Sequence, residues 1–220
     1  MPRKNNPKQT VEKILSVSAR LFTEKGFEKT SMQDIVNAIG MSKGAIFYHF
    51  KSKEEILQAV MALQAQYTEQ TLATWIEEFS GSTAKETLIG LLEKNLHDQQ
   101  MHSLDSTLSS QILNPHFVLS SMQDSVNKSA PFFAKLMREG NEDGSIHTDY
   151  PDECAEVFFL LMNIWCDPMI FACDSARLEK RLKFLQQLMK KMGADIINDE
   201  LIANYLTFIE RLYGDMMDEK

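Results

Sequence analysis

A run of four residues, Ser42-Lys43-Gly44-Ala45, places a cation beside two residues with almost no side chain. Lys43 can donate hydrogen bonds to the guanine acceptors in the major groove of DNA. Gly44 and Ala45 would let a helix approach base edges and phosphates closely. Ser42 is a favoured N-cap residue, so the run predicts the start of a short helix that reads DNA.

Polar side chains suited to phosphate follow this run. Ile46 and Phe50 are four residues apart and are expected to face inward, which turns Tyr48 and His49 outward. A hydroxyl group and an imidazole suit phosphate oxygens. Lys51 and Lys53 add positive charge where a DNA strand would pass.

A helix-turn-helix motif is predicted around these residues. Apolar spacing predicts helices over about residues 32–39 and 43–50, joined by a tight turn at Gly40. An earlier helix is expected from residue 9 or 10 to Lys25, with Gly26 ending it.

Two capping boxes are predicted next to the motif. Thr30 with Gln33, and Ser52 with Glu55, have the required spacing. The helix starts that follow Thr30 and Ser52 would present free backbone N–H groups, which can bind a phosphate.

The charge of the chain is divided unevenly. Residues 1–55 hold ten Lys/Arg and six Asp/Glu, whereas residues 56–220 hold thirteen and twenty-five, so a head of +4 precedes a body of −12. This division indicates an anionic partner for the head alone.

The stretches 30–35 and 40–54 together resemble the signature of the TetR family of bacterial regulators, and with the preceding helix the resemblance covers about residues 9–60. It implies a homodimer on a palindromic operator of double-stranded DNA, and usually repression relieved by a small-molecule effector bound in the C-terminal domain. One position departs from the pattern: Phe47 stands where tyrosine is common, and it lacks the hydroxyl that reaches a phosphate. The predicted DNA-binding residues are Thr30, Ser42, Lys43, Gly44, Ala45, Tyr48, His49 and Lys53.

The whole chain is predicted to be all-α. A three-helix DNA-binding domain is expected over residues 1–53, and a helical ligand-binding and dimerisation domain over residues 54–220. Pro151 suits the first turn of a helix, whereas Pro131 and Pro168 are expected to interrupt or kink theirs.

The C-terminal part has apolar surface in excess. The stretch 152–173 is too apolar to face water, and the apolar stripes at 178–192 and 202–216 need a partner. Dimerisation is therefore expected, and the sequence does not indicate which of these helices form the dimer interface. Large adaptable side chains could line an effector pocket. The candidates are Phe132, Phe133, Phe158, Met162 and Trp165.

Several other classes of function are disfavoured. No catalytic set, phosphate-binding glycine loop or metal-ligand spacing occurs, so neither an enzyme nor a cofactor or metal is predicted. No apolar run approaches the ~20 residues that span a bilayer, and a cytoplasmic protein is expected. An activator of the same family, and a helical ligand-binding protein that does not act on DNA, stay open as alternatives.

The three cysteines, Cys154, Cys166 and Cys173, fit a reduced protein. Cys166 and Cys173 are seven apart and are expected to share a helix face. Burial as small hydrophobes is favoured over a thiol sensor.

Overall fold

A computed structural model describes residues 7–105 and 115–217. The regular structure of these residues is helical throughout, as the sequence predicted. The chain divides into two compact units, Met1–Thr71 with Gln99–Ser110, and Leu72–Asp98 with Gln111–Lys220. The boundary expected after residue 53 therefore lies inside the first unit. No helix among the described residues combines the length and apolar character needed to cross a membrane.

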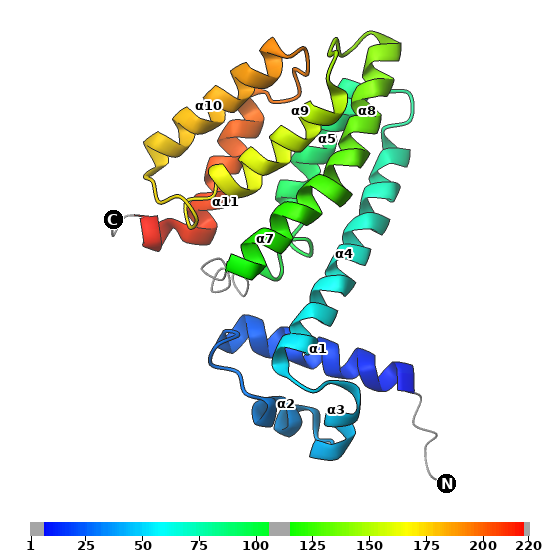
Figure 1. The fold of residues 1–220 in the computed structure, drawn as a ribbon, viewed down its shortest axis with the longest axis vertical. Helices are drawn as coiled ribbons and strands as arrows, with labels where there is room; N and C mark the ends of the chain where they lie inside the picture. Colours follow the sequence, from blue (N-terminus) through cyan, green and yellow to red (C-terminus); the bar gives the residue numbers. More distant parts are fainter. Residues whose placement is uncertain (1–6, 106–114, 218–220) are drawn as a thin grey trace. The chain divides into compact units, whose positions relative to one another are not determined.

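The first unit holds α1 (Pro7–Lys25), α2 (Met32–Ile39), α3 (Lys43–His49) and the start of α4 (Lys53–Glu78). Figure 1 shows α2 and α3 together on one side of α1. Their apolar faces meet in one core, which explains the predicted 3–4 spacing of apolar residues. Its fully buried side chains are Ile14, Phe22, Ile35, Ile46 and Ile56.

A segment distant in sequence completes this core. Leu104 is buried in the same apolar cluster as residues of α1 to α4, and Met101 is also buried. The Gln64 side-chain amide on α4 donates to the carbonyl oxygens of Gln100 and Met101, at 2.7 and 3.0 Å. The segment that follows α5 is thus fastened to the first unit by both apolar burial and hydrogen bonds.

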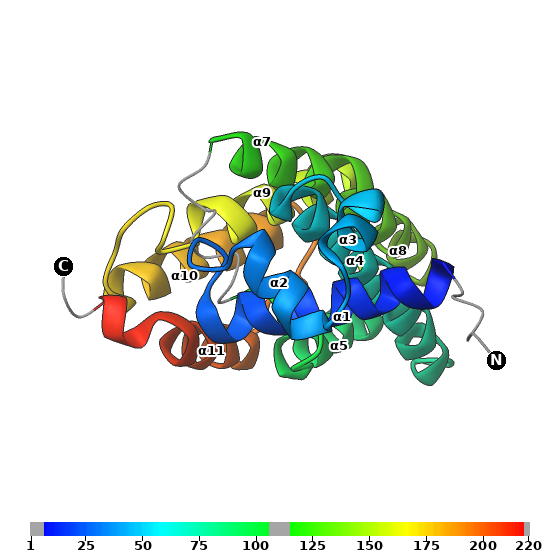
Figure 2. The ribbon, with the colours of Figure 1, turned by 90° about the horizontal axis from the view of Figure 1, so that it is seen from below.

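The second unit is a helical bundle with its own core. Its elements are the end of α4, α5 (Ala84–His97), α7 (Pro115–Asp124), η2 (Ser125–Ser129), α8 (Ala130–Asp143), α9 (Pro151–Leu160), η3 (Leu161–Trp165), α10 (Ser175–Lys191) and α11 (Asp199–Met217). Helices α8 and α9 lie side by side, α10 lies beside α11, and α5 packs on α8 and α11 (Figures 1 and 2).

The prolines act differently from one another. Pro131 lies in the first turn of α8, directly after the π-helical turn η2, where the N–H of Ala130 bonds to the Ser125 carbonyl. The wider turn accommodates the proline ring, which otherwise clashes with a carbonyl one turn earlier. Pro151 starts α9 as predicted. The prediction for Pro168 was wrong, because the helix ends through η3 at Trp165 and Pro168 lies in the turn beyond it.

The same helix end separates two of the cysteines. The expectation that Cys166 and Cys173 share a helix face was wrong, because the helix ends before Cys166. Cys154 and Cys166 are buried, whereas Cys173 is partly exposed, in the loop before α10. Burial raises the pKa of the Cys166 thiol to about 12.

Two loops of the second unit meet at Gly193. Its φ is +81°, and its carbonyl accepts the N–H of His147 at 3.0 Å. A Cβ atom built at Gly193 would overlap the backbone carbonyl oxygen of His147, whereas one built at Gly81, which has φ +93°, would meet only open space.

We expect Gly193→Ala to destabilise the protein more than Gly81→Ala does. Both substitutions force alanine into the left-handed region, at about 1–2 kcal/mol, but only Gly193→Ala adds a clash with backbone. Chemical denaturation of both variants measures the difference. Equal losses of stability in the two variants would show that the loops of Gly193 and His147 can move apart without destabilising the protein.

Candidate nucleic-acid interface

The turn between α2 and α3 sets the direction of α3. Gly40 adopts φ +70°, and its N–H bonds to the Val36 carbonyl at 3.1 Å, closing α2 in the left-handed conformation that glycine favours. Ile39 and Ile46 are buried on either side of this turn. The two helices are therefore joined by a short turn and held by a common core.

The start of α2 is capped by Ser31, not by Thr30 as predicted. The Ser31 hydroxyl accepts the N–H of Asp34, and the Asp34 carboxylate accepts both the Ser31 N–H at 2.8 Å and the Ser31 hydroxyl at 2.6 Å. Lys25 at the end of α1 forms an ion pair with the same carboxylate at 2.9 Å. The bonds from Ser31, followed by the Lys25 ammonium, hold the pKa of Asp34 well below its usual range.

Thr30 is inside the unit rather than on its surface. It is 1% exposed, and its hydroxyl donates to the Gly26 carbonyl at 2.8 Å. Its backbone N–H bonds to the Phe27 carbonyl at 3.2 Å. The threonine side chain thus closes the turn between α1 and α2.

The outer face of α3 carries the predicted DNA-reading residues. Ser42 caps the helix by accepting the N–H of Ala45 at 3.2 Å. Lys43 and Gly44 are exposed, and a Cβ built at Gly44 would meet nothing within 4 Å. Tyr48, one turn further, is 79% exposed. A cation, a bare backbone and a hydroxyl group therefore lie along one open face.

His49 and Phe47 lie at the sides of this face. The His49 ring meets the Tyr48 ring edge-on, with centroids 5.0 Å apart. The Lys43 ammonium lies 5.4 Å from the centre of the Phe47 ring, and the Lys51 ammonium donates to the Phe47 carbonyl at 2.7 Å. Phe47 thus positions two cations, although it has no hydroxyl of its own.

Lys53 links the start of α4 to the turn before α2. Its Nζ donates to the carbonyl oxygens of Phe27 and Glu28, at 3.0 and 3.4 Å, and lies 4.3 Å from the centre of the Phe27 ring. Ser52 caps α4 by accepting the N–H of Glu55 at 3.2 Å. The Glu55 carboxylate accepts the N–H of Lys51, so the predicted second capping box is closed one residue earlier than expected.

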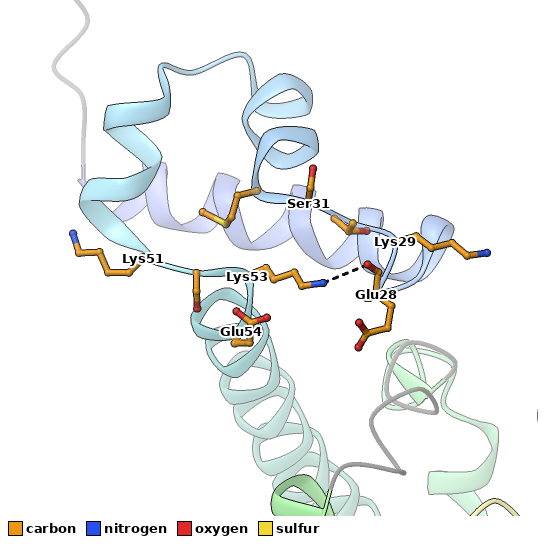
Figure 3. A pocket seen from close by; sticks show the side chains of 9 residues that line it. Glu28, Lys29, Ser31, Lys51, Lys53 and Glu54 are labelled. Carbon is orange, nitrogen blue, oxygen red and sulfur yellow. Dashed lines mark hydrogen bonds between the residues drawn. The ribbon is translucent and has the colours of Figure 1, made fainter.

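A hollow of about 420 Å³ lies between the start of α2 and the start of α4 (Figure 3). Lys51 and Lys29 extend at opposite ends of it, and Lys53 crosses between them toward Glu28. Three ammonium groups, the carboxylates of Glu28 and Glu54, and two helix N-termini surround this hollow. The excess of positive charge makes it suited to an anion such as a phosphate. Of the residues around this hollow, the sequence predicted phosphate contacts for Lys51, Lys53 and the helix starts at Thr30 and Ser52, and it passed over Lys29, whose charge was the available signal.

Two family models match the chain. One, described as "Bacterial regulatory proteins, tetR family", matches residues 14–60, which contain α2, α3 and the start of α4. The other, described as "Tetracyclin repressor-like, C-terminal domain", matches residues 95–188. The chain belongs to the TetR family. As a TetR-family protein it combines the helix-turn-helix head with a C-terminal unit that matches the family independently.

Individual relatives agree with this assignment. The chain is 34% identical over 91 residues to the regulator YerO of Bacillus subtilis, covering 41% of this chain and 32% of YerO. It is 30% identical over 104 residues to the regulator AcrR of Shigella flexneri, covering 46% and 48%. The chain thus spans about a third of the length of the first relative and about half of the second. The solved structure of GusR from Salmonella enterica has the same fold, with a TM-score of 0.58 and 17% sequence identity. The match covers 96% of this chain and 98% of GusR.

The five predicted effector-binding residues all belong to, or pack against, the apolar core of the second unit. Phe133 and Phe158 are buried, with parallel rings 6.1 Å apart, and Phe132 meets Phe133 edge-on. Met162 is partly buried in η3, and Trp165 contacts Phe184 on α10.

A separate hollow of the second unit, about 630 Å³, lies between the end of α4, the start of α5 and the end of α8. Its lining includes Phe79, Leu136 and Glu139, and none of the five predicted effector-binding residues. The effector site therefore stays a prediction.

We expect Asp34→Asn to lower the free energy of unfolding at neutral pH, because the amide cannot accept the Ser31 and Lys25 bonds as a carboxylate does. The pKa of Asp34 is depressed in the folded state, so its contribution is present above the unfolded pKa of about 3.9. It disappears as pH falls through the folded pKa.

Denaturation of both proteins between pH 7 and pH 2 tests this expectation. The difference in free energy of unfolding between the wild type and Asp34→Asn should become smaller below about pH 4. Glu24→Gln, an exposed carboxylate of α1, controls for the change in net charge. A gap that stays constant with pH would mean that the carboxylate charge does not contribute.

Proposed function

We propose that this TetR-family chain is a sequence-specific transcriptional regulator that binds a palindromic DNA operator in the cytoplasm as a homodimer and is released by a small-molecule effector. The observation that carries the proposal is the open outer face of α3, where Lys43, Gly44 and Tyr48 are exposed on a helix anchored by buried Ile46. Such a helix can enter a major groove without rearrangement.

Base and phosphate contacts are assigned to different residues. Lys43 reads guanine at the groove floor, and Gly44 and Ala45 allow the close approach. Tyr48 and His49 bind phosphates beside the groove. The hollow of Figure 3, with Lys29, Lys51 and Lys53 around it, would receive a further phosphate.

Thr30 is proposed to act on DNA through the backbone that it holds, and Lys53 both through the backbone that it holds and through its charge. The Thr30 hydroxyl is engaged by Gly26 and is buried. Lys53 contributes its charge at the hollow while fixing the Phe27–Glu28 turn. Both residues therefore set the distance between the two helix N-termini that face the phosphate.

The dimer face is assigned to α9, η3 and α10. Two rows of apolar residues spaced four apart lie on these adjacent elements: Val157, Leu161 and Trp165, and Phe184, Leu188 and Met192. Phe184 is 55% exposed, and its ring meets that of Trp165 at 5.8 Å, so the two rows join. An apolar surface of this kind is typical of an interface between copies, and two late helices are the usual choice in the TetR family.

Effector response is proposed to pass through the segment after α5. This segment places Leu104 in the core of the first unit, and Gln64 on α4 binds its backbone. An effector that prefers another position of the segment would shift α4 and with it α3. Its leverage is limited to the difference between its affinities for the two states.

Selection of bound duplexes from a random DNA pool tests the function. We expect a two-fold palindrome with half-sites separated by about one helical turn, ~34 Å. Lys43→Ala should lose about 1–3 kcal/mol of affinity and relax preference at one position of each half-site. Lys53→Ala should weaken binding to all sequences and reduce the slope of affinity against salt by about one phosphate contact.

Lys190→Ala on α10 serves as the matched control, since it removes an exposed lysine from the second unit. Selection without enrichment, together with tight binding of a small molecule, would favour the helical ligand-binding alternative. Binding at a promoter with increased transcription would favour an activator.

Phe184→Glu should convert the dimer to a monomer, because it places two charges at the centre of a symmetric apolar interface. We expect a loss of at least about 2 kcal/mol of association free energy. Light scattering after gel filtration measures the mass. Leu119→Glu, at a residue of α7 that is 54% exposed, is the control. Dimers formed equally by both variants would show that another face is used.

A further inference from the structure

The last carbonyl group of α2 has its partner on α1. Carbonyl groups in the last turn of a helix have no acceptor role within that helix and need a donor from elsewhere. The Ile39 carbonyl accepts a hydrogen bond from Nζ of Lys13 at 3.0 Å. The ammonium group also lies at the end of α2 where the helix dipole favours a cation. Lys13 therefore ties α1 to the residue directly before the Gly40 turn.

This tie is the counterpart of the one that Lys53 makes at the other end of α2. Lys53, on α4, donates to the Phe27 carbonyl in the turn that precedes α2. Each of the two bonds joins residues that are 26 positions apart. Helix α2 is thus held near both ends by lysines of two other helices, and each lysine binds backbone rather than a side chain.

The tie at Ile39 bears on the direction in which α3 begins. The Ile39 side chain is buried, which fixes where the chain passes, and the Lys13 bond fixes how its peptide group is oriented as the turn starts. Helix α3 itself is anchored in the core by one buried residue, Ile46. Its first turn, which carries Lys43, therefore depends on the geometry of the turn that Lys13 holds.

We propose that Lys13 is a positioning residue for DNA reading, which acts on α3 through the Gly40 turn and makes no contact with DNA. The inference rests on the proposed function. Without the tie, α3 would sample further orientations, and its apparent affinity for the operator would fall with the fraction of molecules in the competent one. Non-specific binding depends on charge and needs no single orientation of α3. Lys13 thus raises the preference for the operator over other DNA.

A lysine that binds a phosphate behaves differently from a lysine that positions a helix. Loss of a phosphate contact weakens binding to every sequence and reduces the slope of affinity against salt. Loss of a positioning lysine weakens binding to the operator alone and leaves that slope unchanged. The two roles can therefore be separated by measuring operator and unrelated duplexes over a salt series.

The test compares Lys13→Met with the wild type in the full chain, on the operator obtained by selection and on an unrelated duplex of equal length. Methionine keeps an apolar stem and removes both the donor and the charge. We expect operator affinity to fall about fivefold, with the affinity for the unrelated duplex and the salt slope unchanged. Lys13→Arg keeps a charged donor and should recover most of the operator preference.

Arg20→Met is the matched control. Arg20 is exposed on the same side of α1, seven residues further along, and its side chain forms no hydrogen bond with another described residue. The substitution removes the same charge, and the ratio of operator affinity to non-specific affinity should stay at the wild-type value. The proposal is overturned if the two methionine variants change this ratio alike, or if Lys13→Met reduces the salt slope by one phosphate contact.

Hydrogen exchange of the free protein gives a readout that needs no DNA. The Gly40 N–H is bonded to the Val36 carbonyl in the turn that Lys13 holds. We expect peptides that cover this turn to exchange about fivefold faster in Lys13→Met, with the rest of the first unit and all of Arg20→Met unchanged.

Unchanged exchange at the turn would overturn the proposal. Faster exchange throughout the first unit would overturn it as well, because Lys13 would then be a general stabiliser. A wild type that selects no operator would contradict the proposed function, while the exchange rates would still decide whether Lys13 holds the turn.

Discussion

The proposed interface depends on the burial of one side chain, that of Ile46. Helix α3 has seven residues, and Ile46 is its one buried residue. A helix of two turns is unstable in water by itself, since nucleation is unfavourable and few bonds follow. Its shape and direction therefore come from the anchoring of Ile46 and from the left-handed turn at Gly40. The exposed side chains of α3, those of Lys43 and Tyr48, are left available to a partner.

The polar groups around α3 have structural partners and still present charge. Lys51 and Lys53 donate to backbone carbonyls of neighbouring turns, and Lys25 pairs with the carboxylate that caps α2. Such bonds restrict long side chains that would otherwise lose considerable entropy on binding DNA. The head is thus organised for an anion before the anion arrives.

The second unit shows the reverse arrangement, with a cation buried and apolar side chains exposed. Arg181 holds backbone carbonyls together inside the unit, while Phe184 lies half-exposed one turn away on the same helix. Because α9, η3 and α10 all contribute to this region, packing of a second copy would act on these few contacts. The irregular π-helical end of α9 makes this possible, since it brings the Trp165 carbonyl to the guanidinium.

The sequence by itself determined the helical class, the end of α2 at Gly40, the start of α3 at its Ser42 cap and the basic head, because these follow from local periodicity, caps and charge. It also identified the exposed face of α3. Tertiary structure decided the rest. Thr30 is buried in the turn before α2, and Ser31 caps α2 in its place. Lys53 donates to a carbonyl oxygen 25 residues away, and Leu104 is buried in a core formed largely by residues before position 61. The contacts of Lys53 and Leu104 join residues distant in sequence, and local spacing carries no information about which distant backbone or side chain will be near. Thr30 donates to Gly26 and Ser31 to Asp34, both within four positions, so the local pattern offered both as caps, and the burial of Thr30 in the folded unit decided between them.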